Sequence, residues 1–440
     1  MLLEREDMSP DQADTLWGRT PLWWAAKGGS EGVAKMLLGR RDVNPDAADT
    51  KYGATPLMVA AQNGHEGVVK MLLEREEVNP DQADTTYDQT PLLVAAAGGH
   101  ERVAKILLQR KEVNPDHADT KNGRTPLSWA ASGGREGVVK LLLERKDVSS
   151  DHADVQGGWT PLSWAARTGH EGVVMMLLER KEVNPDQADT KYGRKPLSWA
   201  ARGGHEGVVK MLLERKDVDP DHAETEGGWT PLALAAANGH EGVVKILLER
   251  KEVNPDQADT KCGRTPLSLA AVNGHEGVVK RLLEQKNVNP DHADIEGGWT
   301  PLALAAANGH DWVVEMLLEQ KDVNPDQADT RYARTPLSWA ASGGHEGVAK
   351  VLLEQKDINP DHADIEGGWT PLSLAAASGH EGVVKMLLER TEVNPDQADT
   401  KYGRKPLSWA ARGGHEGVVK MLLELKGISL SVPNRPVRPS

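Results

Sequence analysis

The sequence predicts an all-α solenoid of 12 repeats, and three observations carry this prediction. A Pro-Leu pair recurs every 35 residues along the chain. Each repeat contains two short stretches with helical spacing of apolar residues, separated by a turn that contains Gly. A turn-rich segment then leads to the next repeat. Self-similarity at a period of about 20 to 50 residues is typical of a solenoid, a propeller or an array.

The first helix of each repeat is predicted to begin at the Pro of the recurring pair. A Thr side chain can cap free helix amides, and Pro is tolerated at the first helical position. The preceding Thr is found at Thr20, Thr55, Thr90, Thr125, Thr160, Thr230, Thr265, Thr300, Thr335 and Thr370, while Lys195 and Lys405 take the two remaining places. In the repeat that starts at Pro231, the helix is expected to run through Ala236, and Gly239 ends it.

The second helix of the same repeat has one apolar stripe. The stripe extends from Val243 to Leu248, and charged residues such as Glu241 and Lys245 are left for solvent. A repeat cannot bury such a stripe alone, so we expect it to pack on a neighbouring repeat. The turn-rich stretch from Val253 to Gly263 is predicted to form a hairpin-like finger.

Two helices and a finger, with Thr-Pro-Leu, Ala-Ala and Gly-His at fixed places, resemble the ankyrin repeat over almost the whole chain. The resemblance implies an ankyrin-type solenoid over residues 1–426. The repeat is longer than the usual 33 residues, which predicts a longer finger. The His that usually follows Thr-Pro-Leu is replaced, mostly by Ser or Ala as at Ser128 and Ala233. Near-identical repeats of this length resemble the arrays of filamentous fungi, which are often attached to nucleotide-binding signalling proteins.

The two ends of the chain depart from the repeat. Residues Met1–Arg5 occupy the same columns as Met71–Arg75, so the array starts in the middle of a second helix. This start suggests a fragment of a longer polypeptide or a missing upstream domain. At the other end the pattern stops near Lys426, and residues 427–440, with their three prolines, are predicted to form a disordered tail.

Composition excludes several classes of function. The 52 Lys and Arg against 66 Asp and Glu leave a net charge of −14 with no basic stripe, so nucleic acid is a poor partner. Cys262 is the only cysteine, which fits a reducing compartment, the cytoplasm or the nucleus. No apolar run is long enough for a signal peptide or a membrane span, so we expect a soluble protein without a membrane partner.

The residue just before the helix-starting Thr or Lys alternates between Arg and Trp over nine repeats. This Arg/Trp strip consists of Arg124, Trp159, Arg194, Trp229, Arg264, Trp299, Arg334, Trp369 and Arg404. Three places earlier the charge alternates through Lys191, Glu226, Lys261, Glu296, Arg331, Glu366 and Lys401. The repeating block is therefore a pair of 70 residues. If repeats stack at about 10 Å, each Arg should lean over a neighbouring Trp and each Lys should meet a neighbouring Glu.

Two interpretations of the Arg/Trp strip stay open. The strip can hold the repeats in register, through cation–π contacts of about 0.5–1 kcal/mol and exposed ion pairs below about 1 kcal/mol. It can also be the candidate partner-binding site, because Arg and Trp are enriched among interface hot spots. A second Trp column lies inside the first helix and exchanges with Leu, which indicates core packing. Its members are Trp24, Trp129, Trp164, Trp199, Trp339 and Trp409, with Leu234, Leu269, Leu304 and Leu374 in other repeats.

Histidines recur in two columns. One follows Gly at the turn between the helices, at His65, His100, His170, His205, His240, His275, His310, His345, His380 and His415. The other lies between acidic residues of the finger, at His117, His152, His222, His292 and His362. Neither column has the converging ligands that zinc needs, nor the spaced oxygens of a calcium loop. We expect structural hydrogen bonds from the first column and a solvated turn around the second, with no metal and no cofactor.

The motif search favours binding over catalysis. The chain has no phosphate-binding loop and no nucleophile elbow, and each repeat offers nearly the same residues, so no single catalytic constellation is predicted. The leading prediction is a non-enzymatic scaffold that binds a protein along the finger tips and the first-helix face. The acidic surface favours a basic or amphipathic partner. The alternatives are a C-terminal regulatory or sensor array of a larger nucleotide-binding signalling protein, and a mechanical spacer.

Overall fold

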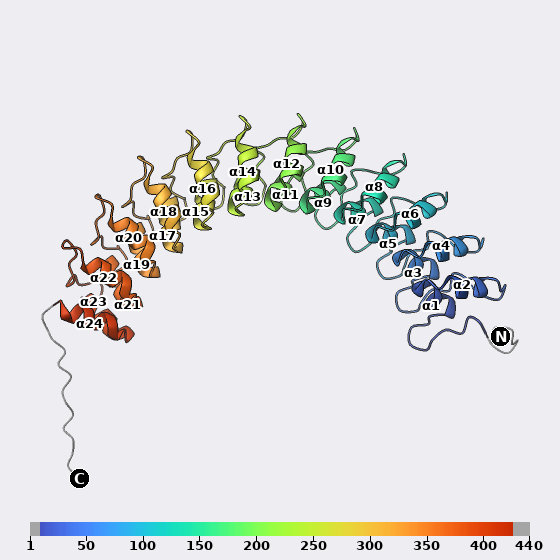
Figure 1. Cartoon of the computed structure of the whole chain (residues 1–440), viewed down its shortest axis with the longest axis horizontal. Coiled ribbons are helices and arrows are strands. Elements are labelled where there is room, and N and C mark those ends of the chain that lie inside the picture. Colours follow the sequence, from blue (N-terminus) through green and yellow to red (C-terminus); the bar gives the residue numbers. More distant parts are fainter. Residues whose placement is uncertain (1–8, 426–440) are drawn as a thin grey trace, which may run out of the picture. The chain divides into compact units, whose positions relative to one another are not determined.

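A computed structural model describes residues 9–425, and within that range the chain forms 24 α-helices and no strand (Figure 1). The first helices of the repeats are α1 (Pro21–Gly28), α3 (Pro56–Gln62), α5 (Pro91–Gly98), α7 (Pro126–Ser132), α9 (Pro161–Thr168), α11 (Pro196–Gly203), α13 (Pro231–Ala237), α15 (Pro266–Val272), α17 (Pro301–Asn308), α19 (Pro336–Gly343), α21 (Pro371–Ser378) and α23 (Pro406–Gly413). The second helices are α2 (Glu31–Leu38), α4 (Glu66–Leu73), α6 (Glu101–Leu108), α8 (Glu136–Leu143), α10 (Glu171–Leu178), α12 (Glu206–Leu213), α14 (Glu241–Leu248), α16 (Glu276–Leu283), α18 (Asp311–Leu318), α20 (Glu346–Leu353), α22 (Glu381–Leu388) and α24 (Glu416–Glu424). The predicted all-α solenoid of helix pairs is confirmed.

The chain divides into two compact halves, Met1–Glu226 and Gly227–Ser440. In each half, first helices pack on the first helices of adjacent repeats, and each second helix packs on the first helix of its own repeat (Figure 1). The predicted mid-helix start at Met1–Arg5 and the predicted tail at 427–440 lie outside the described residues. None of the helices between residues 9 and 425 is both long and apolar enough to cross a bilayer.

The helix starts follow the predicted capping. Every Thr that precedes a first helix accepts a hydrogen bond from the third helical residue, as Thr230 does from the Ala233 amide at 3.2 Å. Lys195 and Lys405 make no such cap. Each pairs instead with an Asp of its own finger, and the Lys405 Nζ lies 3.4 Å from an Asp396 carboxylate oxygen. The first helix then ends before a Gly in the left-handed region, as at Gly239 with φ of 75°.

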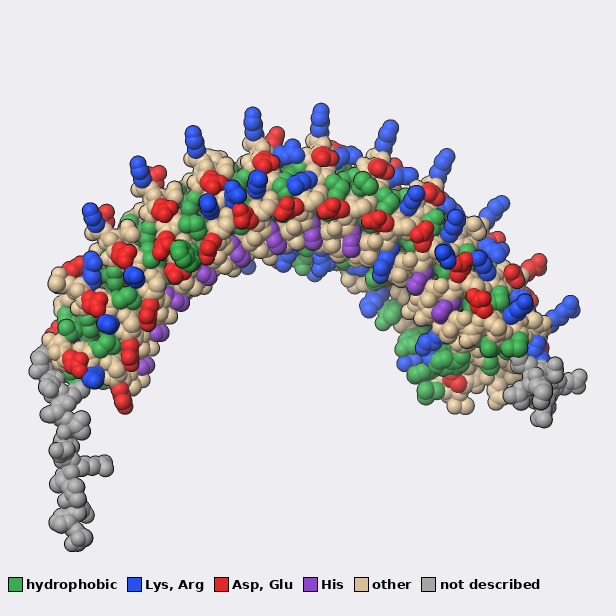
Figure 2. All heavy atoms as spheres, in the orientation of Figure 1, with side chains coloured by type: hydrophobic (Ala, Val, Ile, Leu, Met, Phe, Trp, Pro, Cys, Tyr) green, Lys and Arg blue, Asp and Glu red, His purple; other side chains and the backbone are tan. Residues whose placement is uncertain are grey.

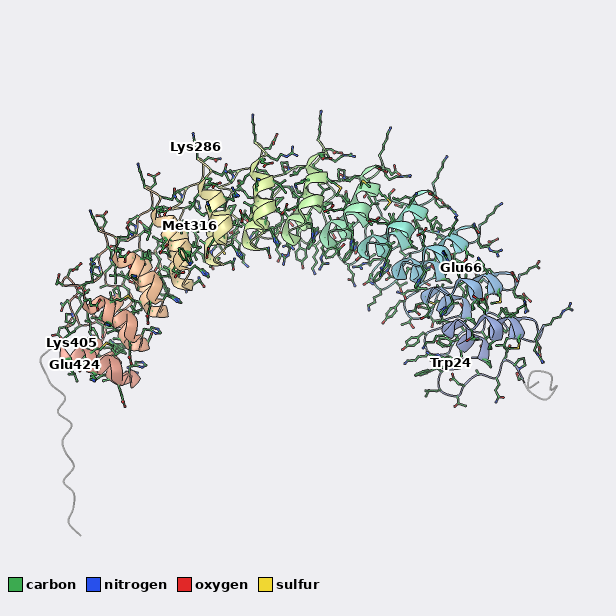
Figure 3. The ribbon with its side chains drawn as sticks, in the orientation of Figure 1. Trp24, Glu66, Lys286, Met316, Lys405 and Glu424 are labelled. Carbon is green, nitrogen blue, oxygen red and sulfur yellow. The ribbon has the colours of Figure 1, made fainter. Side chains whose placement is uncertain are left out.

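The core lies between the two helix layers and between successive repeats. In the repeat that starts at Pro231, Leu232, Leu234, both following Ala residues and the second-helix residues Val243, Val244 and Leu247 are fully buried. Each fully buried Leu or Val contributes about 1.5–3 kcal/mol relative to exposure. The small Ala residues let neighbouring first helices approach. The loop after each second helix is polar, and Lys286 projects from the loop after α16 (Figure 3).

Histidines join the repeats within each half. The Nε2 of His65 donates to the Lys27 carbonyl of the preceding repeat at 3.0 Å, and seven other histidines of this column donate in the same way. Arg135 stands where other repeats have this His, and its Nε donates to the Ala97 carbonyl at 3.4 Å. The structural role predicted for the column is confirmed. Histidines form a row on the surface of each half (Figure 2).

The finger histidines are not surrounded by solvent, so the predicted solvated turn is wrong. The Nε2 of His292 donates to the Gly263 carbonyl of the preceding finger at 3.2 Å, and the other finger histidines repeat this contact. Each of these rings is part-buried. Successive fingers approach closely enough for the imidazole to reach across, because a main-chain hydrogen bond already joins them, as from the Ile295 amide to the Cys262 carbonyl at 2.8 Å.

Candidate partner-binding site

A buried carboxylate organises the finger turn that precedes each first helix. Asp399 shows the arrangement: its carboxylate accepts from the Tyr402 amide at 2.5 Å, the Arg404 amide at 2.9 Å and the Trp409 Nε1 at 3.0 Å. Burial raises the pKa of Asp399, but these hydrogen bonds outweigh it and hold that pKa below its ordinary value. The carboxylate therefore ties the turn to the helix that follows.

Sequence reasoning missed these carboxylates because it treated the acidic finger as solvated. Asp14, the first of the twelve, is half-buried, and the other eleven are at most 8% exposed, at Asp49, Asp84, Asp119, Asp154, Asp189, Glu224, Asp259, Asp294, Asp329, Asp364 and Asp399. Their fixed place, five residues before the Arg/Trp strip and ten before the first-helix Trp column, is the signal that could have found them. A Trp ten residues later can donate its indole N–H to the carboxylate. A fixed spacing between the two residues therefore indicates a buried, hydrogen-bonded Asp, because an Asp in solvent is satisfied by water.

Four of the five Arg residues of the Arg/Trp strip pair with the buried carboxylate of the next repeat. The Arg334 Nε lies 3.0 Å from Asp364 Oδ2, and the Arg264 Nε lies 3.2 Å from Asp294 Oδ2. Arg194 pairs likewise with Glu224, and the Arg124 Nε lies 3.6 Å from Asp154 Oδ2. These four Arg side chains are 11–27% exposed. Burial lowers the pKa of Arg124, which shows how far its guanidinium is withdrawn from water.

The expected stacking of each Arg on a strip Trp is wrong. In residues 9–425 four of the five guanidiniums lie over rings of the first helix or of the turn: the Arg124 Cζ lies 3.4 Å from the Trp164 ring centroid, and the Arg404 Cζ lies 4.7 Å from that of Tyr402. The physical reason is that an ion pair withdrawn from water is stronger than an exposed cation–π contact. The carboxylate of the next repeat therefore takes the guanidinium.

The Trp residues of the strip stack on the first-helix Trp of the next repeat. The ring centroids are 4.3 Å apart for Trp369 and Trp409, 4.4 Å for Trp299 and Trp339, and 4.8 Å for Trp159 and Trp199. Trp229 is also half-buried, but the next repeat has Leu269 in place of the partner ring. The two residue types of the strip thus make two kinds of interface, an ion pair after Arg and a ring contact after Trp.

The alternating charges three places before the strip do not form the expected Lys–Glu pairs. Within the described range, three cations of this column, Lys191, Arg331 and Lys401, lie over the Tyr of their own turn, as Lys191 Nζ does at 4.9 Å from the Tyr192 centroid. Lys261 is followed by Cys262 instead. The neighbouring Glu366 pairs instead with Arg334 of the strip, at 3.8 Å. The Lys and Tyr are adjacent in the turn, so their contact needs no reach across an interface.

The first-helix Trp column belongs mostly to the core, as expected from its exchange with Leu. Trp164, Trp199 and Trp409 are 5–8% exposed, and the four Leu residues of the column are buried. Trp129 and Trp339 are half-buried. Trp24 is the exception at 44% exposed, and it lies in the first helix of the array (Figure 3).

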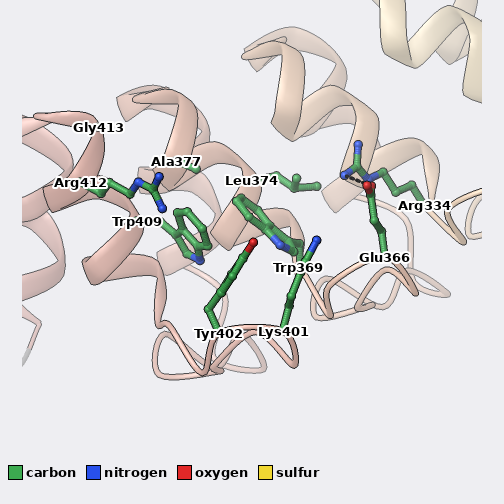
Figure 4. A pocket seen from close by; sticks show the side chains of 10 residues that line it. All are labelled: Arg334, Glu366, Trp369, Leu374, Ala377, Lys401, Tyr402, Trp409, Arg412 and Gly413. Carbon is green, nitrogen blue, oxygen red and sulfur yellow. Dashed lines mark ion pairs between the residues drawn. The ribbon is translucent and has the colours of Figure 1, made fainter.

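Two hollows open where a strip Trp meets a first helix that carries both Trp and Arg. The C-terminal slot, of 550 Å³, lies between α21 and α23 and is lined by Trp369, Lys401, Tyr402, Trp409 and Arg412, with Arg334 and Glu366 at one end (Figure 4). The N-terminal slot, of 450 Å³, lies between α9 and α11 and is lined by Trp159, Arg167, Lys191, Tyr192, Trp199 and Arg202. Both slots use the same 24-residue sequence, which occurs at Lys191–Glu214 and again at Lys401–Glu424.

Metal ligands do not converge anywhere in the part of the chain that the structure describes. No group of three or more His, Cys, Asp or Glu side chains there could hold a metal ion. The slots are lined by rings and cations, and they hold no pair of a nucleophile with a base. The slots therefore offer rings and cations to a ligand, on the surface that the finger turns and the first helices form.

A family model described as ankyrin repeats (3 copies) matches nine overlapping stretches of the chain, at residues 1–84, 76–154, 146–223, 184–259, 216–294, 232–329, 286–364, 324–399 and 359–434. These stretches leave only the last residues of the chain unmatched. No curated protein matches the sequence.

Proposed function

Because the chain belongs to the ankyrin repeat family, whose repeats are generally protein-interaction modules and typically not catalytic, we propose that it is a non-enzymatic scaffold that binds a protein partner. The partner lies along the finger turns and the exposed side of the first helices. We also place the protein in the cytoplasm or the nucleus, because Cys262 is its only cysteine.

The observation that carries this proposal is the pair of slots. Each slot is bounded by a finger turn on one side and by two first helices on the other, which is the face predicted from the sequence. Their volumes of 550 and 450 Å³ fall within the range of about 300–1,000 Å³ that is usual for ligand pockets. Rings and Arg side chains line them, and these residue types dominate the binding energy of protein interfaces.

The Arg/Trp strip divides into two roles under this proposal. Four Arg side chains of the strip form buried ion pairs with the next repeat, so they hold successive repeats in register. Trp159 and Trp369 stay half-exposed in the two slots, where a partner can cover them. Both interpretations of the strip therefore apply, each to a different residue type.

The test combines Trp159→Ala, Trp299→Ala and Trp369→Ala in one chain, which removes the strip Trp of both slots. Ala occurs naturally in this column at Ala54, so the backbone accepts it. Partners are captured by crosslinking in the native cell and identified, and melting is followed in parallel by circular dichroism. The matched control is Trp312→Gly, which removes a Trp that is 62% exposed on α18 and restores the Gly that most other repeats have there.

The two readouts decide the proposal together. It is supported if the triple variant loses a partner that the wild type and the Trp312 variant both capture, while melting is unchanged. Lower melting with the partner retained shows that these Trp residues serve packing and contradicts a binding role. A native cell in which the wild type captures no partner contradicts the scaffold itself and favours a mechanical spacer.

A further inference from the structure

Three aromatic rings form the floor of each slot. In the C-terminal slot the Trp369 and Trp409 centroids are 4.3 Å apart with 36° between the planes, and Tyr402 meets Trp409 edge-on at 6.0 Å (Figure 4). In the N-terminal slot Trp159 and Trp199 are 4.8 Å apart, and a Tyr meets Trp199 edge-on at 6.2 Å. Tyr402 is 55% exposed. Such a floor favours an apolar or aromatic side chain from a ligand.

Cations without an acidic partner stand at the rim of both slots. The Arg412 Cζ lies 5.5 Å from the Trp409 centroid and the Lys401 Nζ lies 5.6 Å from that of Tyr402. In the N-terminal slot the Arg167 Cζ lies 4.7 Å from the Trp159 centroid. These cations and Lys191 are exposed, and within residues 9–425 none of them has a carboxylate oxygen within 4 Å of its nitrogen atoms. They are therefore held in place by rings and are available to a ligand.

Cations outnumber carboxylates among the residues that line each slot, with Arg334, Lys401 and Arg412 against Glu366 in the C-terminal slot, and only cations in the N-terminal slot. In the C-terminal slot Glu366 pairs with Arg334, which also pairs with the buried Asp364. In the N-terminal slot Glu224 is paired with Arg194. The buried Asp189 and Asp399 accept from turn amides and from the Trp indole of the same repeat. Each slot therefore carries a local excess of positive charge, although the chain as a whole carries −14. Charges farther away matter less, because the screening length at physiological salt is about 8 Å.

We propose that the two slots bind extended acidic segments of a partner protein. An apolar or aromatic side chain of the segment lies against the three rings, and the flanking carboxylates meet Lys401 and Arg412, or Lys191 and Arg167. This inference rests on the scaffold function and specifies its partner. An acidic segment is the opposite of the basic partner that the net charge of the chain favours. A quaternary ammonium ligand is disfavoured as well, because the rim of each slot is already cationic.

One repeat of the chain shows which residues can replace the rings of a slot without disturbing the fold. The repeat that follows Trp229 has Cys262, Leu269 and Val272 where the C-terminal slot has Tyr402, Trp409 and Arg412. Leu269 is 5% exposed, so the same packing is achieved with Leu in the place of Trp. The substitutions Trp409→Leu and Arg412→Val, with Trp199→Leu and Arg202→Val in the other half, therefore use residues that this fold already accepts.

The experiment starts from the full chain and a displayed library of short random peptides. Enriched peptides are expected to combine Asp or Glu with large apolar residues. Their affinities are then measured by fluorescence anisotropy for the wild type and for the chain with all four substitutions. We expect a Kd at least tenfold higher for the substituted chain, with unchanged melting, and weaker binding to the wild type as salt rises.

A charge exchange separates recognition from a general effect on the fold. A second variant keeps the rings of both slots and replaces the four rim cations, with Lys191→Glu, Arg167→Glu, Lys401→Glu and Arg412→Glu. This variant should no longer bind an enriched acidic peptide. It should bind instead the counterpart peptide in which every Asp or Glu is replaced by Lys. Enrichment of basic or trimethyllysine peptides, or equal affinity for the wild type and the four-substitution chain, overturns the slot proposal. The scaffold function then still stands or falls on the crosslinking in the native cell.

Discussion

Removing the guanidinium of Arg334 should loosen the junction between two repeats in the second half. Arg334→Met keeps most of the side-chain volume and leaves Asp364 with its two turn hydrogen bonds, from the Gly367 amide at 3.1 Å and the Trp369 amide at 3.0 Å. The Asp364 side chain is fully buried and the Arg334 side chain is 16% exposed. The substitution therefore leaves a charge away from water with less compensation than it has in the wild type.

The expected cost is about 2–3 kcal/mol. Breaking a buried pair typically costs about 3–5 kcal/mol, and the two retained amides reduce this toward the roughly 1.5–3 kcal/mol that a hydrogen bond to a charged group contributes. Arg390→Met is the matched control, because the Arg390 side chain is 41% exposed and its pair with Glu392 at 3.0 Å should contribute less than about 1 kcal/mol.

Hydrogen exchange measured by mass spectrometry is the suitable assay, because stability in a repeat array is local. In Arg334→Met, the turn around Gly367 and Trp369 should exchange about 30- to 100-fold faster, at about 1.4 kcal/mol for each tenfold change. A double-mutant cycle with Asp364→Asn should give a coupling of at least about 1 kcal/mol. A coupling below about 0.5 kcal/mol, or an effect no larger than that of Arg390→Met, would refute the assignment of the strip Arg residues as interface ion pairs.

Three further predictions concern other junctions. Burial raises the pKa of Asp361, so its contribution to stability is present below the unfolded pKa of about 3.9 and is lost as pH rises through the raised folded pKa. Asp361→Asn should therefore flatten the decline in denaturation midpoint as the pH rises above about 4, and an unchanged slope speaks against this. His380→Ala removes a 3.1 Å hydrogen bond between repeats and should lower local stability by about 1 kcal/mol, as measured by hydrogen exchange. His380→Arg should lower it less, because Arg135 makes the same contact in its own repeat. Equal losses for the two variants would contradict a role of this hydrogen bond. Lys405→Thr should restore the missing cap of α23 and raise the free energy of unfolding by about 0.5–1 kcal/mol in chemical denaturation; a loss of stability would show that the Lys405 pair with Asp396 matters more.

Comparing equivalent positions among the repeats predicted part of the slots and missed the rest. The alternation of Arg and Trp is plain in the sequence, and it points to the correct face of the repeat. The side chains that complete the slots were left out, because Arg412 stands in a column that varies among Lys, Gln, Ala, Ser, Arg and Val and has no periodic signal. No role was predicted for Tyr402. Their convergence on Trp369 depends on the stagger of two successive repeats.

The sequence by itself determined the period, the helix pair, the Thr and Pro helix starts and the buried stripe, because each depends on residues that are near one another in the chain. The tertiary structure decided which members of the columns meet. Every repeat offers nearly the same Arg, Trp, His and Asp, so the pairing of Arg334 with Asp364, rather than with Trp369, follows from burial: a carboxylate withdrawn from water attracts a cation more strongly than a half-exposed ring does. The same burial leaves Lys401 and Arg412 outside, unpaired with any acid of the described chain and next to the rings.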